Sequence, residues 1–489
     1  MEHPPLYPFQ ERAVARFLEQ KCLLVAHNVG MGKTRTAVEA LRRLAANTPD
    51  FRALAVTPAN LRDNFLKTMR QFAPCVKSAI ARKADDVDTT AVPVVSFDFM
   101  RTHVRFLVRR RFDALVCDEF HHSKNRDTGN HACLSKLRTR MPCFLCLTGS
   151  PLQNSIREFW TLMDLVSGRP ISGELDLCLE RAWDERRVPF WKRWFLRLFS
   201  TRPVLGPLKG VADPLRFKSL ASRWIDFVDD ETASKSRPQV MSSQINVALT
   251  SSEWYIYRSV VAKTGKRALK ALQSCEADNL EAIASKITSL ALARQTLMCV
   301  NALDKECAEP ELSAKALAVI EQVRKGPFPA IVYSNFFRHG AKAIHERLCS
   351  AGLDAVLLHG QMSNGERHDA RDGFCGGKND ILVMTPVGGE GLDFPRVRSL
   401  HIVDPHWNPE VTRQTIGRAV RLSSVFPVLS VFHYIACGPN GQETIDHAIM
   451  SVSRRKEAVN QVIRRILTHP VQDNNPIPFH QAPTQGSDL

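Results

Sequence analysis

The segment from Cys22 to Thr34 reads CLLVAHNVGMGKT, an apolar run followed by glycines, a lysine and a threonine. A helical pattern through Ala37, Leu41 and Leu44 comes directly after it, so the segment predicts a buried strand, a tight loop and a helix. Glycines allow backbone N–H groups to curl around a phosphate, and the start of the helix adds a positive dipole. We therefore predict a short phosphate loop formed by Gly30, Met31, Gly32, Lys33 and Thr34.

Two side chains of the phosphate loop are predicted to bind ATP and its metal ion directly. Lys33 would reach the β- and γ-phosphates, and the hydroxyl of Thr34 would ligate Mg²⁺. The longer form of this motif has its first glycine four residues before Gly30, and Ala26 stands there. The sequence therefore matches only the short form of the motif.

Short apolar runs alternate with amphipathic stretches in the first and last thirds of the chain, and helical spacing dominates between them. Because strands separated by helices form parallel sheets, this rhythm predicts an α/β fold. We expect an N-terminal ATP-binding lobe (1–166), a mainly helical insertion (167–312), a C-terminal lobe (313–470) and a disordered tail (471–489). The predicted strands are Cys22–Ala26, Ala53–Thr57, Val92–Phe97, Ala114–Cys117, Cys143–Thr148, Ala330–Ser334, Ala355–His359, Ile381–Thr385, Ser399–Val403 and Val428–Tyr434.

A pair of carboxylates follows the predicted strand Ala114–Cys117. Asp118 and Glu119 would lie at the carboxyl edge of the sheet, where parallel α/β folds bind ligands. Asp118 is predicted to hold Mg²⁺ through water, and Glu119 to orient or deprotonate the attacking water. An isolated Asp-Glu pair is commonly a solvated turn, but the phosphate loop upstream favours the catalytic interpretation.

The composition is that of a globular protein with a strong positive charge. Apolar residues make up 44% of the 489 residues, and Lys plus Arg exceed Asp plus Glu by 66 to 50. This charge would attract a polyanion such as nucleic acid, and no run of about eighteen apolar residues offers a membrane span. The N-terminus lacks a secretory signal, so we expect an intracellular, reducing location, with the nucleus, a viral factory or a virion as candidates.

The cysteines are expected to be thiols, and one pair resembles half of a zinc site. Cys143 and Cys146 form the single Cys-x-x-Cys of the thirteen cysteines, but no second pair of ligands stands at comparable spacing. The apolar run CFLCL predicts a buried strand instead.

The segment Leu147–Asn154, LTGSPLQN, resembles the third motif of superfamily-two helicases, and within them of the Swi/Snf-like remodelling ATPases. In the last third, Thr385–Phe394 resembles the fifth motif, and Asp404–Pro409 resembles the family's signature before the sixth. Gln414–Arg421, QTIGRAVR, resembles the sixth motif itself. The resemblance covers roughly Tyr7 to Arg465 and implies two RecA-like P-loop lobes, with ATP and magnesium as cofactors.

Two departures from the family pattern lie far apart in the sequence. The acidic residues usual before the phosphate loop are replaced by Ala26, His27 and Asn28. The Arg-Arg-x-Lys element expected near residue 225 is missing, and Asp226–Asp230 stands there instead. These differences weigh against nucleosome remodelling and are similar to what free-standing motors of large DNA viruses show.

The resemblance assigns further residues to ATP. Arg418 and Arg421 are predicted to lie on one face of a helix and to act as arginine fingers. Gln414, one turn before Arg418, would lie near the same nucleotide. Tyr7–Gln10 resembles the Q-motif, in which the amide of Gln10 would pair with adenine.

The resemblance also implies a set of nucleic-acid contacts at the ends of strands. Hydroxyls and loop N–H groups bind phosphate oxygens without reading sequence, so binding should tolerate any sequence and weaken with salt. A lone Ser or Thr more often caps a helix or a turn. The implied contacts are Thr57, Pro58 and Ser96 in the first lobe, and Ser334, His359, Gly360 and Thr385 in the second.

The sequence therefore predicts a nucleic-acid-dependent ATPase that moves along double-stranded DNA. The alternatives are a strand-separating DNA or RNA helicase, which needs stacking aromatic residues along a single strand, and a viral transcription-associated DNA-dependent ATPase. A catalytically silent scaffold would not need Lys33, Asp118 and Glu119 together, and a P-loop kinase or GTPase would not need the sixth motif.

Overall fold

The computed structural model describes residues 5–28, 30–152, 155–183, 205–228, 238–264, 290–302, 310–386, 392–421 and 424–479. These residues form two compact units. The first unit contains the described residues up to 228 and from 459 to 479, and the second contains those from 238 to 458. No helix within the described ranges is long and apolar enough to cross a membrane.

The first unit is built on a seven-stranded parallel sheet. All five strands predicted for this region are present, and β3 and β9 were not predicted. β3 is only three residues long and half-buried, and a charged residue interrupts the apolar run of β9. In sheet order the strands are β3 (Ser78–Ile80), β4 (Val92–Ser96), β2 (Ala53–Thr57), β5 (Ala114–Cys117), β6 (Cys143–Leu147), β1 (Cys22–His27) and β9 (Ile225–Val228).

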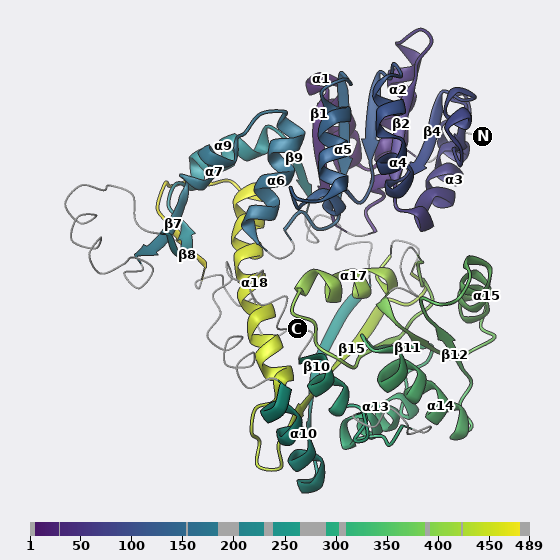
Figure 1. The fold of residues 1–489 in the computed structure, drawn as a ribbon, viewed down its shortest axis with the longest axis vertical. Helices are drawn as coiled ribbons and strands as arrows, with labels where there is room; N and C mark the ends of the chain where they lie inside the picture. Colours follow the sequence, from purple (N-terminus) through teal and green to yellow (C-terminus); the bar gives the residue numbers. More distant parts are fainter. Residues whose placement is uncertain are drawn as a thin grey trace. The chain divides into compact units, whose positions relative to one another are not determined.

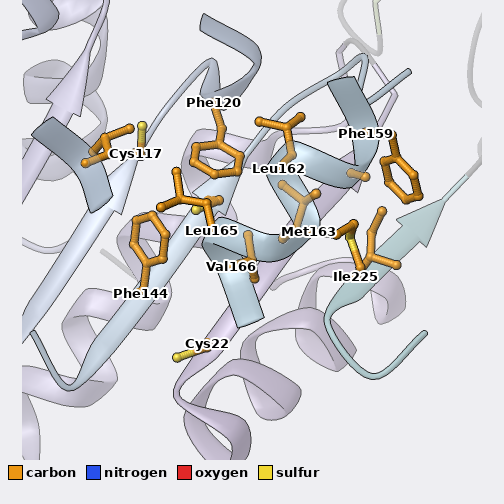
Figure 2. Packing of buried hydrophobic residues seen from close by; sticks show 14 of the residues in the cluster. Cys22, Cys117, Phe120, Phe144, Phe159, Leu162, Met163, Leu165, Val166 and Ile225 are labelled. Carbon is orange, nitrogen blue, oxygen red and sulfur yellow. The ribbon is translucent and has the colours of Figure 1, made fainter. Parts of the chain in front are cut away.

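Helices cover both faces of this sheet, because successive side chains of each strand point to opposite sides. On one face, Leu23 and Val25 pack with α1 (Pro8–Gln20), α2 (Lys33–Ala46) and α3 (Arg62–Phe72). On the other, Phe120, Phe144 and Leu165 pack closely together (Figure 2). The helices of that face are α4 (Phe97–Val108), α5 (Gly129–Arg138), α6 (Ile156–Ser167), α7 (Ser172–Asp176), α9 (Pro214–Ser222) and the last turns of α18 (Ile445–Thr468). Short 3₁₀ turns are η1 (Ala59–Leu61), η2 (Ala84–Asp88) and η3 (Phe120–Ser123).

The Cys-x-x-Cys run lies in strand β6, as predicted. Cys143 and Cys146 are both buried in the core, and burial raises the pKa of each thiol. The two side chains therefore act as small apolar groups.

The second unit contains a six-stranded parallel sheet (Figure 1). In sheet order its strands are β10 (Gln239–Ala248), β15 (Val428–Cys437), β14 (Ser399–Ile402), β11 (Ala330–Tyr333), β13 (Ile381–Met384) and β12 (Ala355–Leu358). One face carries α13 (Ala314–Arg324), the π-helical turn η7 (Phe337–Lys342) and α14 (Ala343–Ser350), and the other carries α15 (Asn364–Cys375) and α17 (Pro409–Ala419). A smaller core joins α10 (Ser251–Thr264), the helix at residues 290–296 and the first turns of α18. The prediction of an α/β fold with two parallel-sheet lobes is confirmed.

The range predicted as a mainly helical insertion contains several strands. Besides helices, its described residues include β7 (Leu179–Trp183), β8 (Leu205–Val211), β9 and β10. β9 belongs to the first sheet and β10 to the second. β10 is polar and half-exposed along its length, so it carries no apolar run for a sequence pattern to detect. The helical pattern from Leu269 to Ile287 lies outside the described residues.

The predicted disordered tail is partly ordered. β16 (Ile477–Pro478) pairs antiparallel with β8 in a small third sheet of order β16-β8-β7. Phe479 is buried in the core of the first unit. Residues 477–479 are ordered, because the apolar side chains of Ile477 and Phe479 pack against the core of the first unit.

Candidate active site

The phosphate loop joins the end of β1 to the start of α2, as the sequence predicts. Gly30 has φ 83° and Gly32 has φ 70°, the left-handed region that favours glycine. Met31 between them is 1% exposed and packs with Phe9 and Val228. This anchor holds the loop so that it leads into the first turn of α2, whose N–H groups have no partner within the helix.

Lys33 and Thr34 are the first two residues of α2. Lys33 Nζ donates to the carbonyl of His27 at 3.0 Å and to that of Asn28 at 3.3 Å. The carbonyls that precede the loop therefore orient the ammonium group, and they accept from two of its three N–H donors. The Thr34 side chain is half-buried at the same helix end.

Gln10 supports the phosphate loop from α1. Its side chain is 4% exposed, and its Nε2 donates to the carbonyl of Met31 at 3.0 Å. Its Oε1 accepts from the N–H of Tyr7 at 3.0 Å. A Cβ at Gly32 would lie 2.6 Å from Gln10 Nε2. Both polar atoms of the Gln10 amide therefore bond to backbone groups of this chain. Its contact with adenine stays a prediction.

Asp118 and Glu119 follow β5 at the same sheet edge as the phosphate loop, because β5, β6 and β1 are parallel neighbours. Asp118 is buried, and its Oδ1 accepts from the N–H of Glu119 at 2.9 Å. Glu119 has φ 46°, a left-handed conformation that is strained for a residue other than glycine. The two adjacent carboxyl groups lie in different surroundings.

The two carboxyl groups ionise differently. Burial, reinforced by the charge of Glu119, raises the pKa of Asp118 to about 7. Burial also opposes ionisation of Glu119, but a hydrogen bond from His121 and the charges of His121 and Lys33 hold the pKa of Glu119 below its ordinary value. The surroundings of Glu119 therefore favour its ionised form, whereas those of Asp118 favour its protonated form.

His121 links this pair to the segment that resembles the third motif. Its Nδ1 lies 3.2 Å from Glu119 Oε2 and 3.3 Å from the hydroxyl of Thr148. The same hydroxyl accepts from the N–H of Ser150 at 3.1 Å. The sequence alone indicates no role for His121, although this residue stands two residues after Glu119. Gln153 and Asn154 of this motif lie outside the described residues.

Arg418 and Arg421 do not share a helix face, so that prediction is wrong. α17 ends at Ala419 because Val420 takes an extended conformation, with φ −96° and ψ 93°. The two side chains nevertheless meet one short segment of the second unit. Arg418 donates to the carbonyl of Leu392 at 3.2 Å, and Arg421 pairs with the carboxylate of Asp393.

Gln414 lies on α17 one turn before Arg418 and is half-buried. Residues 387–391, the middle of the segment that resembles the fifth motif, lie outside the described residues.

The residues implied as nucleic-acid contacts in the first unit lie at the carboxyl ends of two paired strands. Thr57 at the end of β2 is in register with Ser96 at the end of β4, and Pro58 follows Thr57. The Ser96 hydroxyl accepts from the N–H of Phe99 and caps α4. The Thr57 hydroxyl is buried and has no hydrogen-bond partner in the described part of the chain.

In the second unit the implied contacts follow three neighbouring strands, β11, β12 and β13. Ser334 is fully buried and donates its hydroxyl to Asp404 at 2.6 Å, so this hydroxyl is bonded to the first residue of the segment that precedes the sixth motif. Half-buried His359 lies 4.5 Å from the Phe337 ring, centroid to centroid. Gly360 is exposed, and Thr385 is buried with its N–H bound to the carbonyl of Leu358.

Two protein families match successive parts of this chain. Residues 9–312 match the family described as SNF2-related domain, and residues 314–423 match the helicase conserved C-terminal domain. A protein of Acanthamoeba polyphaga mimivirus, named for ATP-dependent RNA helicase activity, is 19% identical over 95% of this chain and 97% of its own length. A protein of Drosophila willistoni named DNA repair and recombination protein RAD54-like is 22% identical over 90% of this chain.

The chain spans 60% of the length of that Drosophila protein. Among solved structures, the Sulfolobus solfataricus SWI2/SNF2 ATPase core in complex with dsDNA aligns over 96% of this chain and 98% of that one. Its identity is 16% and its TM-score 0.40. Since the first family match alone extends over more than half of the sequence, the chain belongs to the SNF2-related family of superfamily-two helicase-like ATPases.

Proposed function

We propose that this chain is a nucleic-acid-stimulated ATPase that couples hydrolysis to movement along double-stranded DNA. The observation that carries the proposal is the SNF2-related match from residue 9 to residue 312, together with the DNA-repair names of several relatives. Such an activity belongs in a reducing compartment that holds DNA, such as a nucleus or a viral factory.

In the proposed mechanism the first unit holds the nucleotide. Lys33, oriented by the carbonyls of His27 and Asn28, donates to the β- and γ-phosphates, and the loop N–H groups enclose these phosphates. Glu119, kept ionised by His121, orients and deprotonates the attacking water. Gln10 keeps the loop in shape and Gln414 contributes from the second unit.

Magnesium fits the oxygen ligands at this edge of the sheet. Asp118 supplies a buried carboxyl group whose pKa burial raises, and a divalent cation beside it would favour the ionised form. Thr34 supplies a hydroxyl at the start of α2. When bound, the ion would neutralise charge on the phosphates during transfer.

Arg418 and Arg421 are proposed to act as arginine fingers from the second unit. Each guanidinium donates to the end of the segment that resembles the fifth motif, through Leu392 and Asp393. Exchange of these partners for the γ-phosphate would tie nucleotide state to the conformation of that segment. Nucleic-acid phosphates would be held at the strand ends that carry Thr57, Pro58 and Ser96 in the first unit, and Ser334, His359, Gly360 and Thr385 in the second.

A strand-separating RNA helicase is the second candidate, because the mimivirus relative aligned over almost its full length is named for that activity. Steady-state ATPase rates with no polymer, blunt duplex DNA, single-stranded DNA and RNA separate the two. We expect duplex DNA to stimulate hydrolysis most, with Lys33→Ala as the inactive control. Greater stimulation by RNA than by duplex DNA would favour the helicase.

A further inference from the structure

The two departures from the family pattern meet in the folded protein. His27 ends β1 and Asp226 lies on β9, the strand that pairs with β1. His27 Nε2 lies 2.8 Å from Asp226 Oδ2, and the side chains are 0% and 1% exposed. A basic residue thus stands where the family has an acidic one, and an acidic residue stands near the expected basic element.

Asp226 is held from two sides. Arg12 and Arg16 of α1 approach its Oδ1 at 3.1 Å and 2.8 Å, while His27 approaches the other oxygen. Hydrogen bonds from His27 and Arg12 lower the pKa of Asp226 to about 2, although burial opposes this. Burial lowers the pKa of His27, so a neutral imidazole donates its Nε2 proton to a fixed carboxylate.

The His27 ring has few other restraints. It meets the Phe9 ring edge-on at a centroid distance of 5.3 Å, and its Nδ1 has no hydrogen-bond partner among the described residues. The bond to Asp226 is therefore the polar contact that fixes the side chain. The backbone carbonyl of the same residue accepts the ammonium of Lys33 at 3.0 Å.

β9 also touches the loop directly. The N–H of Asn28 donates to the carbonyl of Val228 at 3.3 Å, and Val228 packs with Met31. Movement of β9 relative to β1 would therefore move the residues that flank the phosphate loop.

We propose that Asp226 and His27 form a buried, hydrogen-bonded pair that positions the phosphate loop by fixing the carbonyl on which Lys33 rests. His27 and Asp226 are positioning residues, and they act on the nucleotide through Lys33. The inference rests on the phosphate loop assigned under the proposed function. Without the pair, the carbonyl that orients Lys33 is no longer fixed, and the loop binds nucleotide less tightly.

A double-mutant cycle with Lys33 on the full chain tests this. His27→Leu keeps the volume of the side chain but removes the donor, and His27→Gln keeps a donor as the conservative replacement. We expect His27→Leu to weaken binding of a fluorescent ADP about tenfold, and His27→Gln to restore it to within about threefold. In the Lys33→Ala background, His27→Leu should change affinity by less than about twofold.

His401→Leu is the matched control, since His401 is equally buried in the second unit and bonds to Tyr434 at 2.8 Å. It should lower the melting temperature without changing ADP affinity. If His27→Leu fails to fold, Asp226→Asn takes its place in the cycle, and its loss of affinity should likewise vanish in Lys33→Ala. Equal losses in both backgrounds would overturn the proposal. If the single variant Lys33→Ala binds ADP as tightly as the wild type, the phosphate-loop assignment is overturned instead.

Discussion

Replacement of Gly32 by alanine should disturb the phosphate loop in two separable ways. Gly32 has φ 70°, so a side chain there is strained whatever space surrounds it. The new Cβ would also lie 2.6 Å from Nε2 of Gln10, which is held by its bonds to Met31 and Tyr7. The backbone strain arises at residue 32 itself, whereas the steric clash depends on the presence of the Gln10 side chain.

The free-energy cost of each disturbance can be estimated separately. A left-handed conformation costs a non-glycine residue about 1–2 kcal/mol. Displacement of Gln10 leaves the Met31 carbonyl without its buried donor, at a cost of about 1–3 kcal/mol. Gly32→Ala should therefore destabilise the first unit by about 2–5 kcal/mol, but by only about 1–2 kcal/mol when Gln10 is already alanine.

Urea unfolding of the wild type, the two single variants and the double variant measures this difference. Hydrogen exchange in peptides from α1 and α2 identifies the transition of the first unit. A cost of Gly32→Ala that is the same in both backgrounds, within about 0.5 kcal/mol, would refute the contact between Gln10 and the loop.

Lys33→Ala should abolish hydrolysis, because the β- and γ-phosphates lose their cation, and near-normal turnover would refute the phosphate-loop assignment. Glu119→Gln should bind ATP in a filter assay but hydrolyse it about a hundredfold or more slowly, since the water loses its base; loss of ATP binding would give Glu119 a different role. Arg421→Ala should keep ATP affinity while turnover falls about a hundredfold, and weak binding with normal turnover would place Arg421 in ground-state binding. Burial lowers the pKa of His27, and its partners lower that of Asp226 to about 2, so both bind fewer protons in the folded state. The stability that these two groups contribute is fully present above about pH 6.5 and declines towards about pH 2. His27→Gln should therefore reduce the change in the urea midpoint between about pH 7 and about pH 5. An equal change in the wild type and the variant would contradict this prediction.

Much of the fold could be predicted because buried parallel strands are continuous apolar runs. The runs beginning at Ala53 and Ala114 match β2 and β5 residue for residue. The strand, loop and helix around Lys33 were predictable for the same reason, since glycine spacing and helical periodicity are local features.

The remaining features depend on contacts between distant residues. His27 and Asp226 are 199 residues apart, and neither position by itself indicates its partner. β10 is half-exposed, so its sequence resembles a polar connection. The spacing of Arg418 and Arg421 predicts one helix face, but α17 ends at Ala419, two residues before Arg421, because Val420 is extended.

Triplex displacement on blunt duplex DNA tests most directly whether this ATPase moves along paired DNA. A motor that travels on the duplex strips a bound third strand while the two strands beneath stay paired. We predict ATP-dependent release of the third strand, no release by Lys33→Ala, and no unwinding of a tailed duplex under the same conditions. Retention of the third strand together with efficient unwinding of the tailed duplex would contradict the proposed translocation.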